Sequence, residues 1–427
     1  MDNEQSKSAP PNPHYPARCY RTHRIDELQL EEPSVIAGRL TTENTLCDET
    51  GEMALCTDFN LRTGDIVEIE GHLQNNTFHV KSFRLLAPSH QPNSSNLTPR
   101  IKNSLRQRAK IIADIRHFFD QKDFLEIDTP LLVSHPGMEP HLEAFKTSFE
   151  NHPLYLHTSP EYAMKRLLSA GFERIYQICK AFRHEPAGRM HNPEFTILEW
   201  YRAYADYTHI MADTENLIAQ LATTLHGSPI IQRANHTVDL TPPWERLTVC
   251  EALSQYAGIS ADPFTDPARF ASCAQSKGHT TITDRDTPED VFFKVFLDGV
   301  EQHLGYKKPT ILYDYPTPMA ALSKRKAESP NISERFEVYI AGVELANAFT
   351  ELNDPKEQHD RLKNEAIQRR AEGRPVYPID PHFLAALETG MPPAGGIALG
   401  IDRLIMLLVG ASSINDVLAF PLPNSSQ

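Results

Sequence analysis

Two predicted β-hairpins carry charged side chains whose types and spacing suit the binding of a phosphate and of a cation. The first covers residues 174–204, where RIYQICKAFR and EFTILEWYRAY alternate as strands and HEPAGRMHNP forms the loop between them. Arg183 and Glu185 stand where the first strand ends. A guanidinium at that point, together with loop backbone, could hold a phosphate group.

The second strand of this hairpin places a carboxylate among apolar side chains. Period-two alternation puts Glu199 on one face with Phe195, Ile197 and Tyr201, while Trp200 points to the other face. A carboxylate in such surroundings is costly to bury without a partner. It either forms an ion pair with an arginine inside the fold or lines a pocket that receives a cationic ligand.

The second hairpin is RFEVYIAGVELANAFTELND, and it is unusually acidic for a strand pair. Its three carboxylates are Glu337, Glu344 and Glu351. Alternation places Asn347, Phe349 and Glu351 on one face and Glu344 on the opposite one. Exposed charges at a sheet edge are the simple explanation, but the apolar residues around them favour a buried role. Carboxylate oxygens near a phosphate-binding arginine suit Mg²⁺.

A third segment, residues 395–407, reads GGIALGIDRLIML and predicts a glycine-rich strand that runs into a helix. The helix is expected to begin near Asp402 and Arg403. Glycine-rich turns before helices occur in many folds, and a single arginine there is more often structural than functional. This segment therefore gains meaning only in combination with the other two.

The elements that must position these segments begin with a helix. Apolar residues fall at helical spacing over RIKNSLRQRAKIIADIRHFFDQ, and FLEIDTPLL after it is typical of a strand that ends at Pro130. Six basic residues lie between Arg100 and Arg116, against the single acid Asp114. They form either a solvated helix face or a contact for an acidic partner.

The part of the chain before this helix predicts a separate small domain. Short alternating segments from Ser34 onward predict about five strands and favour a small β-barrel, with the OB-fold as the leading candidate. Residues 87–99 have the composition of a linker. Residues 1–95 contain 8 Lys and Arg against 14 Asp and Glu, a net charge of −6, which does not suit a track for nucleic-acid phosphates. RNA binding and a docking role both stay open for the barrel.

The composition of all 427 residues is that of a globular protein. Hydrophobic residues make up 40% and charged residues 23%, and the formal net charge is −14. These values exclude collagen-like and wholly disordered chains, and they argue against binding to nucleic acid or membranes through net charge. The six cysteines show no CxxC pair or zinc spacing and are expected to be reduced thiols.

In their order and spacing, the three segments resemble the signature motifs of class II aminoacyl-tRNA synthetases, with the lysyl branch as the nearest. The first motif is the helix from Arg108 with the strand ending at Pro130. The second is FRHE with HNPEF, and the third is GIALGIDR, ending at Arg403. The resemblance covers roughly residues 100–427. It implies an α+β fold, in which an antiparallel sheet flanked by helices forms an aminoacyl-adenylate from ATP with Mg²⁺.

The resemblance also implies a role for each matching residue. Arg183 would bind the α-phosphate of ATP, Glu185 the adenine amino group, and His191 the γ-phosphate. Phe195 and Arg403 would stack on the two faces of adenine, and the two arginines would be the catalytic residues. The implied Mg²⁺ ligands are Glu337 and Glu344. The implied pocket for the amino acid consists of Gly137, Glu161, Glu199, Tyr201, Asn347, Phe349, Glu351 and Ala398.

Two departures from the lysyl-tRNA synthetases resemble the elongation factor P–lysine ligases, truncated paralogues that attach (R)-β-lysine or lysine to a lysine of that factor. NLTPRIKNSLRQRAKIIADIRHFF stands where the synthetases place an Arg/Tyr-rich run of the RYRQRY type. Ala398 stands where they have glycine. Its methyl group would favour a β-amino group, although one methyl is worth only about 1–3 kcal/mol of discrimination. The ligases lack an N-terminal barrel, which this chain keeps in a reduced, acidic form.

The resemblance therefore implies transfer of lysine or (R)-β-lysine to elongation factor P. The alternatives are a lysine–tRNA ligase with a minimal anticodon-binding domain, whose partner would be tRNA, and a non-catalytic ligand-sensing paralogue. We expect a disordered arm over residues 1–20, a reduced OB-like barrel over 21–95 and a catalytic domain over 96–427. We also expect a cytoplasmic protein without membrane contact. A homodimer is implied because the first motif usually lies at the subunit interface.

Overall fold

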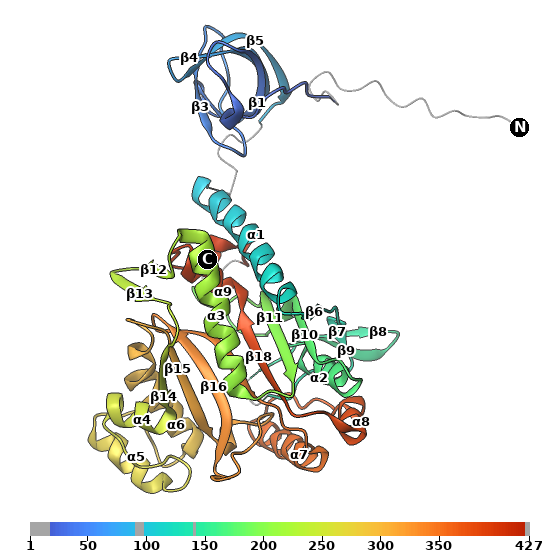
Figure 1. Ribbon diagram of the computed structural model, residues 1–427, viewed down its shortest axis with the longest axis vertical. Coiled ribbons are helices and arrows are strands. Elements are labelled where there is room, and N and C mark those ends of the chain that lie inside the picture. Colours follow the sequence, from blue (N-terminus) through green and yellow to red (C-terminus); the bar gives the residue numbers. More distant parts are fainter. Residues whose placement is uncertain (1–17, 90–97, 140–141, 423–427) are drawn as a thin grey trace, which may run out of the picture. The chain divides into compact units, whose positions relative to one another are not determined.

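The computed structural model describes residues 18–89, 98–139 and 142–422. The chain divides into two compact units, Met1–Lys102 and Asn103–Gln427 (Figure 1). Most of the arm predicted over residues 1–20, and most of the linker predicted over residues 87–99, lies outside the described residues. The limits predicted for the domains stay predictions.

The first unit is a closed barrel with the strand order β1-β2-β3-β5-β4. Its strands are β1 (Pro33–Thr42), β2 (Thr45–Cys47), β3 (Glu52–Cys56), β4 (Ile66–Gln74) and β5 (Thr77–Ala87). Alternate side chains such as Ile36, Ile69 and Phe78 fill its interior and are fully buried. A five-stranded closed barrel is the architecture of the OB-fold, so the prediction of a small OB-like barrel is confirmed.

The second unit is built on a mixed sheet with the order β14-β15-β16-β17-β18-β11-β10-β6. All neighbours in it are antiparallel except β14 with β15 and β10 with β6. Its strands are β6 (Leu125–Glu126), β10 (Arg174–Phe182), β11 (Glu194–Ala203), β14 (Glu245–Thr248), β15 (Thr310–Pro316), β16 (Ile332–Ile340), β17 (Val343–Thr350) and β18 (Ala394–Gly400). Two small sheets contain β7 (Leu132–Val133), β8 (Lys146–Phe149) and β9 (His152–Leu156), and β12 (Ile230–Arg233) and β13 (His236–Asp239).

Helices cover this sheet on both faces, which confirms the predicted α+β fold. They are α1 (Pro99–Asp120), α2 (Glu161–Ser169), α3 (Tyr207–His226), α4 (Val249–Ala252), α5 (Pro267–Ser276), α6 (Pro288–Gly299), α7 (Pro355–Ala371), α8 (Pro381–Gly390) and α9 (Ile401–Leu408). The main core packs α1, α3 and α9 against one face of the sheet, and α2, α7 and α8 pack against the opposite face near one end (Figure 1). No helix within the described residues is long and apolar enough to span a bilayer.

Strand β11 shows how the alternation of the sequence divides the sheet. Leu198 and Trp200 enter the helix-covered core and are fully buried. Phe195, Ile197 and Tyr201 point to the other face, where a cavity opens. The face predicted for these side chains is therefore the face on which they lie.

The strand predicted after the first helix is shorter than expected. Only Leu125–Glu126 forms β6, whereas the pattern predicted a strand up to Pro130. The strand pairs in parallel with β10 at two positions, and one further bond joins the Ile127 N–H to the Tyr176 carbonyl. Proline has no N–H to donate, so the chain cannot continue the ladder at Pro130.

A buried ion pair ties the first helix to the centre of the sheet. Arg108 on α1 donates one hydrogen bond of 2.6 Å to Asp402 at the start of α9 and one of 2.7 Å to the Thr196 hydroxyl. The Thr196 N–H donates to the second Asp402 oxygen at 2.9 Å. The Asp402 residue is only 3% exposed, so its charge depends on these partners.

We predict that Arg108→Ala lowers the free energy of unfolding of the second unit by about 3 kcal/mol, because it leaves the buried Asp402 carboxylate without its cation. Urea unfolding followed by the fluorescence of Trp200 and Trp244, the two tryptophans of the chain, measures this change. The control is Arg116→Ala on the same helix, which removes an exposed pair with Glu126 and should cost less than about 1 kcal/mol. Equal effects of the two variants would contradict the prediction.

Candidate active site

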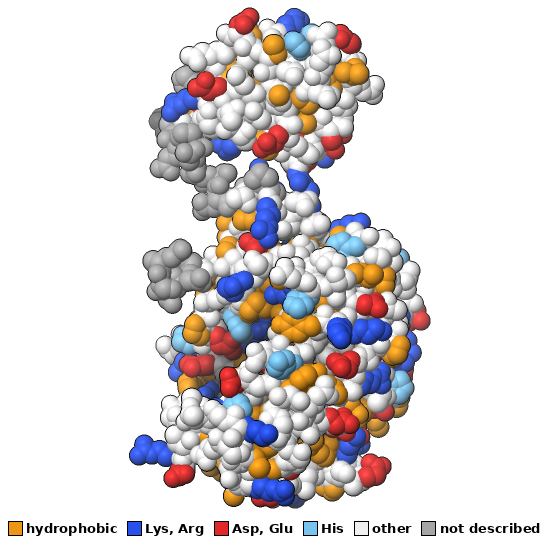
Figure 2. All heavy atoms as spheres, turned by 90° about the vertical axis from the view of Figure 1, so that its left-hand side faces the viewer, with side chains coloured by type: hydrophobic (Ala, Val, Ile, Leu, Met, Phe, Trp, Pro, Cys, Tyr) orange, Lys and Arg blue, Asp and Glu red, His pale blue; other side chains and the backbone are white. Residues whose placement is uncertain are grey.

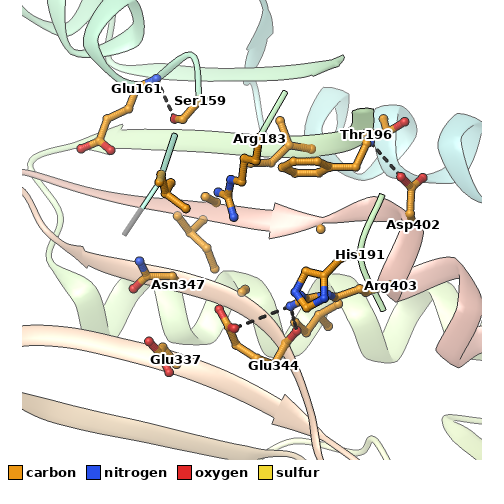
Figure 3. A pocket seen from close by; sticks show the side chains of 18 of the residues that line it. Ser159, Glu161, Arg183, His191, Thr196, Glu337, Glu344, Asn347, Asp402 and Arg403 are labelled. Atoms are coloured by element: carbon orange, nitrogen blue, oxygen red, sulfur yellow. Dashed lines mark hydrogen bonds and ion pairs between the residues drawn. The ribbon is translucent and has the colours of Figure 1, made fainter. Parts of the chain in front are cut away.

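A cavity of about 300 Å³ opens on the sheet face that α2, α7 and α8 only partly cover. Its walls come from β11, β16, β17, β18, the start of α9 and the loop between β10 and β11. Glu161 and Asn347 lie toward one end of the view, His191 and Arg403 lie toward the other, and Arg183 lies between them (Figure 3). The Glu344 carboxylate lies beside Arg403, so the cavity has arginines in its middle and at one end and acidic side chains at both ends.

Arg183 brings an uncompensated positive charge to the cavity. It follows the last residue of β10, and its guanidinium lies over the Phe195 ring, 5.0 Å from the ring centre. Its Nε is buried without a hydrogen-bond partner, and no carboxylate within the described residues forms an ion pair with it. A stacked guanidinium with free donors is well suited to hold a phosphate group.

Arg403 is held mainly by backbone oxygens. At the start of α9, it donates to the Glu344 carbonyl at 2.6 Å and to the Met190 carbonyl at 3.2 Å, and a third contact of 2.6 Å joins it to His191 Nε2. Burial and the neighbouring Arg403 lower the pKa of His191, so that its ring is neutral and accepts this bond. The second arginine of the cavity is thus fixed in place while keeping most of its charge.

Glu337 and Glu344 lie beside each other because of a β-bulge. In the pairing of β16 with β17, Val338 faces Ala346 but Tyr339 faces Glu344, so Leu345 is an extra residue. The bulge reverses the alternation, and Glu344 therefore lines the same cavity as Asn347 although the sequence placed it on the opposite face. This is a correction to the predicted parity.

The Glu337 carboxylate is held from three sides. Arg335 donates to one oxygen at 2.6 Å, and the hydroxyls of Tyr315 and Tyr339 donate to the other at 2.6 and 2.7 Å. Burial raises the pKa of Glu337, Arg335 opposes the rise, and Glu344 adds to it. Within the described residues no group of three His, Cys, Asp or Glu side chains is arranged around a metal position. Two glutamates are nevertheless a usual protein contribution to Mg²⁺ that also binds phosphate oxygens.

Glu199 lies behind the wall of the cavity near Glu161 and is fully buried. The Ser159 hydroxyl donates to one of its oxygens at 2.6 Å, and the Tyr201 hydroxyl donates to the other at 2.9 Å. Burial raises the pKa of Glu199 to about 8, and the nearby Glu161 contributes to the shift. The carboxylate has hydroxyl donors but no ion pair among the described residues, so a bound ammonium group would complete its surroundings.

Glu161 and Glu351 lie next to it and share one cation. Lys165, on α2, places its Nζ 2.6 Å from Glu161 and 2.5 Å from Glu351. The sequence allowed an ion pair between Glu199 and an arginine inside the fold. The structure has a buried ion pair there, but it joins Lys165 to Glu161 and Glu351.

Strand β18 forms the floor between the two hairpins. Ala398 pairs with Glu199 on one side and with Asn347 on the other, so its methyl group lies between them on the cavity face. Two residues earlier, a side chain at Gly396 would overlap the Glu351 carboxylate and the Tyr201 ring. Glycine at this position is what lets the acidic side chains approach the strand.

The structure brings most of the predicted site residues to one cavity. Those that line it are Glu161, Arg183, Glu185, His191, Phe195, Tyr201, Glu337, Glu344, Asn347, Phe349, Ala398 and Arg403. Glu199 and Glu351 are buried behind its wall. Gly137 does not line it but lies in an adjoining cavity that shares Glu139, Ser159 and Glu161.

The sequence reasoning missed Glu139, which lines the cavity, and three polar residues that contact its carboxylates. Ser159 stands two positions before Glu161, and Arg335 two before Glu337, so alternation on RFEVY would have found the latter. Lys165 follows Glu161 by four residues on α2, the spacing of neighbours on one helix face. Each contacts a carboxylate of the site.

Known proteins resemble this chain along most of its length. Residues 94–424 match the family described as tRNA synthetases class II (D, K and N). A lysine–tRNA ligase of Pelotomaculum thermopropionicum is 35% identical, over 96% of this chain and 90% of its own length. A second, of Trichormus variabilis, is 33% identical over 98% and 86%. A third, of Prochlorococcus marinus, is 40% identical over 76% and 65%.

These relatives belong to the family that the sequence motifs resemble. Members of this family are ATP-dependent ligases that form an aminoacyl-adenylate. The match covers the complete sheet, the helices around it and every residue of the cavity described above. With its fold, its cavity and its relatives in agreement, the chain belongs to the class II tRNA synthetase family and is an ATP-dependent ligase.

Proposed function

We propose that the protein activates lysine or (R)-β-lysine with ATP and transfers it to a lysine side chain of elongation factor P. The observation that carries the first step is that one cavity contains the two arginines Arg183 and Arg403 and, away from Arg403, Glu161, with the buried Glu199 behind its wall. An adenylate of a lysine-type amino acid has the same polarity, with a phosphate near its middle and an ammonium group at one end.

The reaction we propose needs no nucleophile from the protein. The carboxylate of the amino acid attacks the α-phosphorus of ATP, and the bond to the pyrophosphate oxygen breaks. Arg183 and Arg403 neutralise charge on the phosphates, and the neutral His191 ring would donate a hydrogen bond to the γ-phosphate. Mg²⁺ held through Glu337 and Glu344 would supply further charge neutralisation. Such positioned charges account for most of the acceleration in reactions of this kind.

The remaining residues are proposed to select the two substrates. Phe195 would stack on adenine and Glu185 would receive its amino group. The proposed amino-acid pocket consists of Gly137, Glu161, Glu199, Tyr201, Asn347, Phe349, Glu351 and Ala398. Support comes from the buried Glu199. A substrate side chain that ends in an ammonium group would bind next to this carboxylate more favourably than a neutral side chain would.

In the second step a lysine amine of the acceptor attacks the carbonyl carbon, the bond to the phosphate oxygen breaks, AMP leaves and an amide forms.

The electrostatics of the barrel support a protein acceptor. Arg21, Arg24, Lys81 and Arg84 each pair with a carboxylate of the barrel itself. On the face seen in Figure 2, acidic and basic side chains of the barrel are interspersed. This distribution does not provide a basic track for nucleic-acid phosphates.

A specific observation also favours a second candidate, the charging of tRNA with lysine. The similarity to lysine–tRNA ligases extends over 96–98% of this chain and so includes the barrel.

A cytoplasmic location is part of either proposal. A homodimer is proposed as well, and it is supported by exposed apolar side chains close to the first motif, which are Leu125, Leu131, Leu132 and Phe149.

We predict that Arg183→Ala and Arg403→Ala each slow amino-acid-dependent ATP–pyrophosphate exchange at least about 100-fold, because each removes charge stabilisation at the phosphates. Arg202→Ala is the control, since this arginine of β11 pairs with Asp213 and does not line the cavity. Full activity in either cavity variant would refute its phosphate role.

We predict that (R)-β-lysine supports exchange better than lysine, and that Ala398→Gly shifts the ratio of their kcat/KM values toward lysine by about tenfold. The physical reason is the methyl group between Glu199 and Asn347. Ala394→Gly, a fully buried position on the same strand outside the cavity, serves as the control. A ratio that is the same in Ala398→Gly and in the parent protein would contradict this role.

The acceptor is tested by offering purified elongation factor P and bulk tRNA side by side, with labelled amino acid and ATP. We expect the label on the protein factor in an amide that survives mild alkali. Label that enters tRNA as an alkali-labile ester, with none on the factor, would overturn the protein acceptor and support the second candidate.

A further inference from the structure

The loop between β10 and β11 is held in place by the C-terminal part of the second unit. This loop lines the cavity with Met190, His191 and Asn192. Within the described part of the chain, every hydrogen bond from residues 189–192 to a place outside the hairpin goes to residues 403–422. Residues that stand 212–230 positions later in the sequence therefore set where this part of the cavity wall lies.

Helix α9 contacts the loop from both of its ends. At its start, Arg403 donates to the Met190 carbonyl at 3.2 Å, and its guanidinium lies 2.6 Å from His191 Nε2, so that the two side chains are neighbours in Figure 3. After its end the chain returns to the loop, where the Ile414 N–H donates to the Arg189 carbonyl at 3.0 Å. Three consecutive loop residues are thus fixed by one helix and by the segment that follows it.

The segment after α9, residues 412–422, also makes contacts that depend on side chains. The Arg189 guanidinium donates to the Ser412 carbonyl at 3.2 Å, and the Ser413 hydroxyl donates to the Arg189 carbonyl at 3.3 Å. Arg189 is exposed and is not among the residues that line the cavity. Its side chain therefore contacts the segment rather than the space in which a ligand would lie.

The same segment is anchored in the core of the unit. Ile414 is only 1% exposed, belongs to the main hydrophobic core and lines the cavity. Farther along, the Leu422 N–H donates to Asn192 Oδ1 at 3.2 Å. Because one end of the segment is packed in the core, it provides a fixed support for the loop. The proposed reaction assigns this support no task.

We propose that residues 412–422 are a positioning element of the nucleotide site, and that their contacts with Arg189 hold the loop so that His191 and Arg403 keep their places beside the phosphates. The inference rests on the proposed roles of these two residues in binding ATP. A loop that is already held loses less conformational freedom when the nucleotide binds. Weaker support should therefore raise the KM for ATP and leave the KM for the amino acid unchanged.

The first test compares Arg189→Met with Arg233→Met in ATP–pyrophosphate exchange. For Arg189→Met we expect the KM for ATP to rise roughly threefold to tenfold, the loss typical of one hydrogen bond. The KM for the amino acid should stay within about twofold, because its pocket is unchanged. Arg233 is the matched control, since it donates to the neighbouring Ala411 carbonyl at 2.9 Å from β12 instead of from the loop. An unchanged KM for ATP in Arg189→Met, or an equal rise in Arg233→Met, would overturn the proposal.

A second variant changes the contact from the other side. Ser413→Ala removes the hydroxyl that donates to the Arg189 carbonyl and should raise the KM for ATP about twofold to fivefold. The same hydroxyl accepts from the Asn415 N–H at the start of a short 3-10 helix. Thr287→Ala removes the corresponding cap of α6, none of whose residues lines the cavity, and controls for the lost cap. If Arg189 acted by touching ATP directly, Ser413→Ala would leave the KM for ATP unchanged, and that result would refute the role of the segment.

A measurement without substrate separates this inference from the proposed function. Amide hydrogen exchange over residues 188–192 should be faster in Arg189→Met and in Ser413→Ala than in the parent protein, and unchanged in Arg233→Met. If the parent protein activates neither lysine nor (R)-β-lysine, the proposed amino acid is wrong, but the exchange rates still decide whether the segment holds the loop. Parental exchange rates in Arg189→Met would contradict the inference.

Discussion

The structure depends on burying several carboxylates close together, next to a nucleotide-sized cavity. Each would cost several kcal/mol if it were left without partners in an environment of low dielectric constant. Three different solutions appear side by side. Glu161 and Glu351 share Lys165, Glu199 relies on two hydroxyl donors, and Glu337 is held by an arginine and two tyrosines. Glu199 has hydroxyl donors but no ion pair among the described residues, and burial raises its pKa to about 8, so a cation bound next to it would favour its charged form.

The acidic side chains and the arginines of the site have different kinds of partner. Near Glu161, side chains of the protein neutralise one another. Arg183 stacks on an aromatic ring, and Arg403 is oriented chiefly by carbonyl oxygens, with Glu344 at 3.6 Å as its only ion-pair partner among the described residues. Rings and carbonyl groups orient a guanidinium without cancelling its charge. This arrangement suits a ligand with a phosphate near its middle and an ammonium group at one end.

A few positions of the scaffold place the charged side chains of the cavity. Strand β18 runs between the hairpins, and Gly396 gives the Glu351 carboxylate and the Tyr201 ring the room that a side chain would fill. The bulge at Leu345 turns Glu344 toward the cavity. On the opposite face, Arg108 and Asp402 fix the first helix to the strand that carries Glu199. Each of these features aligns elements that lie far apart in the sequence.

The sequence by itself determined the first helix, the two hairpins of the site and the faces of their regular strands, because side chains on a strand alternate with a period of two. Phe195, Glu199 and Tyr201 therefore lie where their positions predicted, and the motif spacing identified the family. Only the tertiary structure decided which charges meet. The bulge that moves Glu344 changes one hydrogen-bond register, and the pairing of Lys165 with Glu351 joins residues 186 positions apart. Alternation describes one strand at a time, whereas ion pairs depend on how separate elements pack.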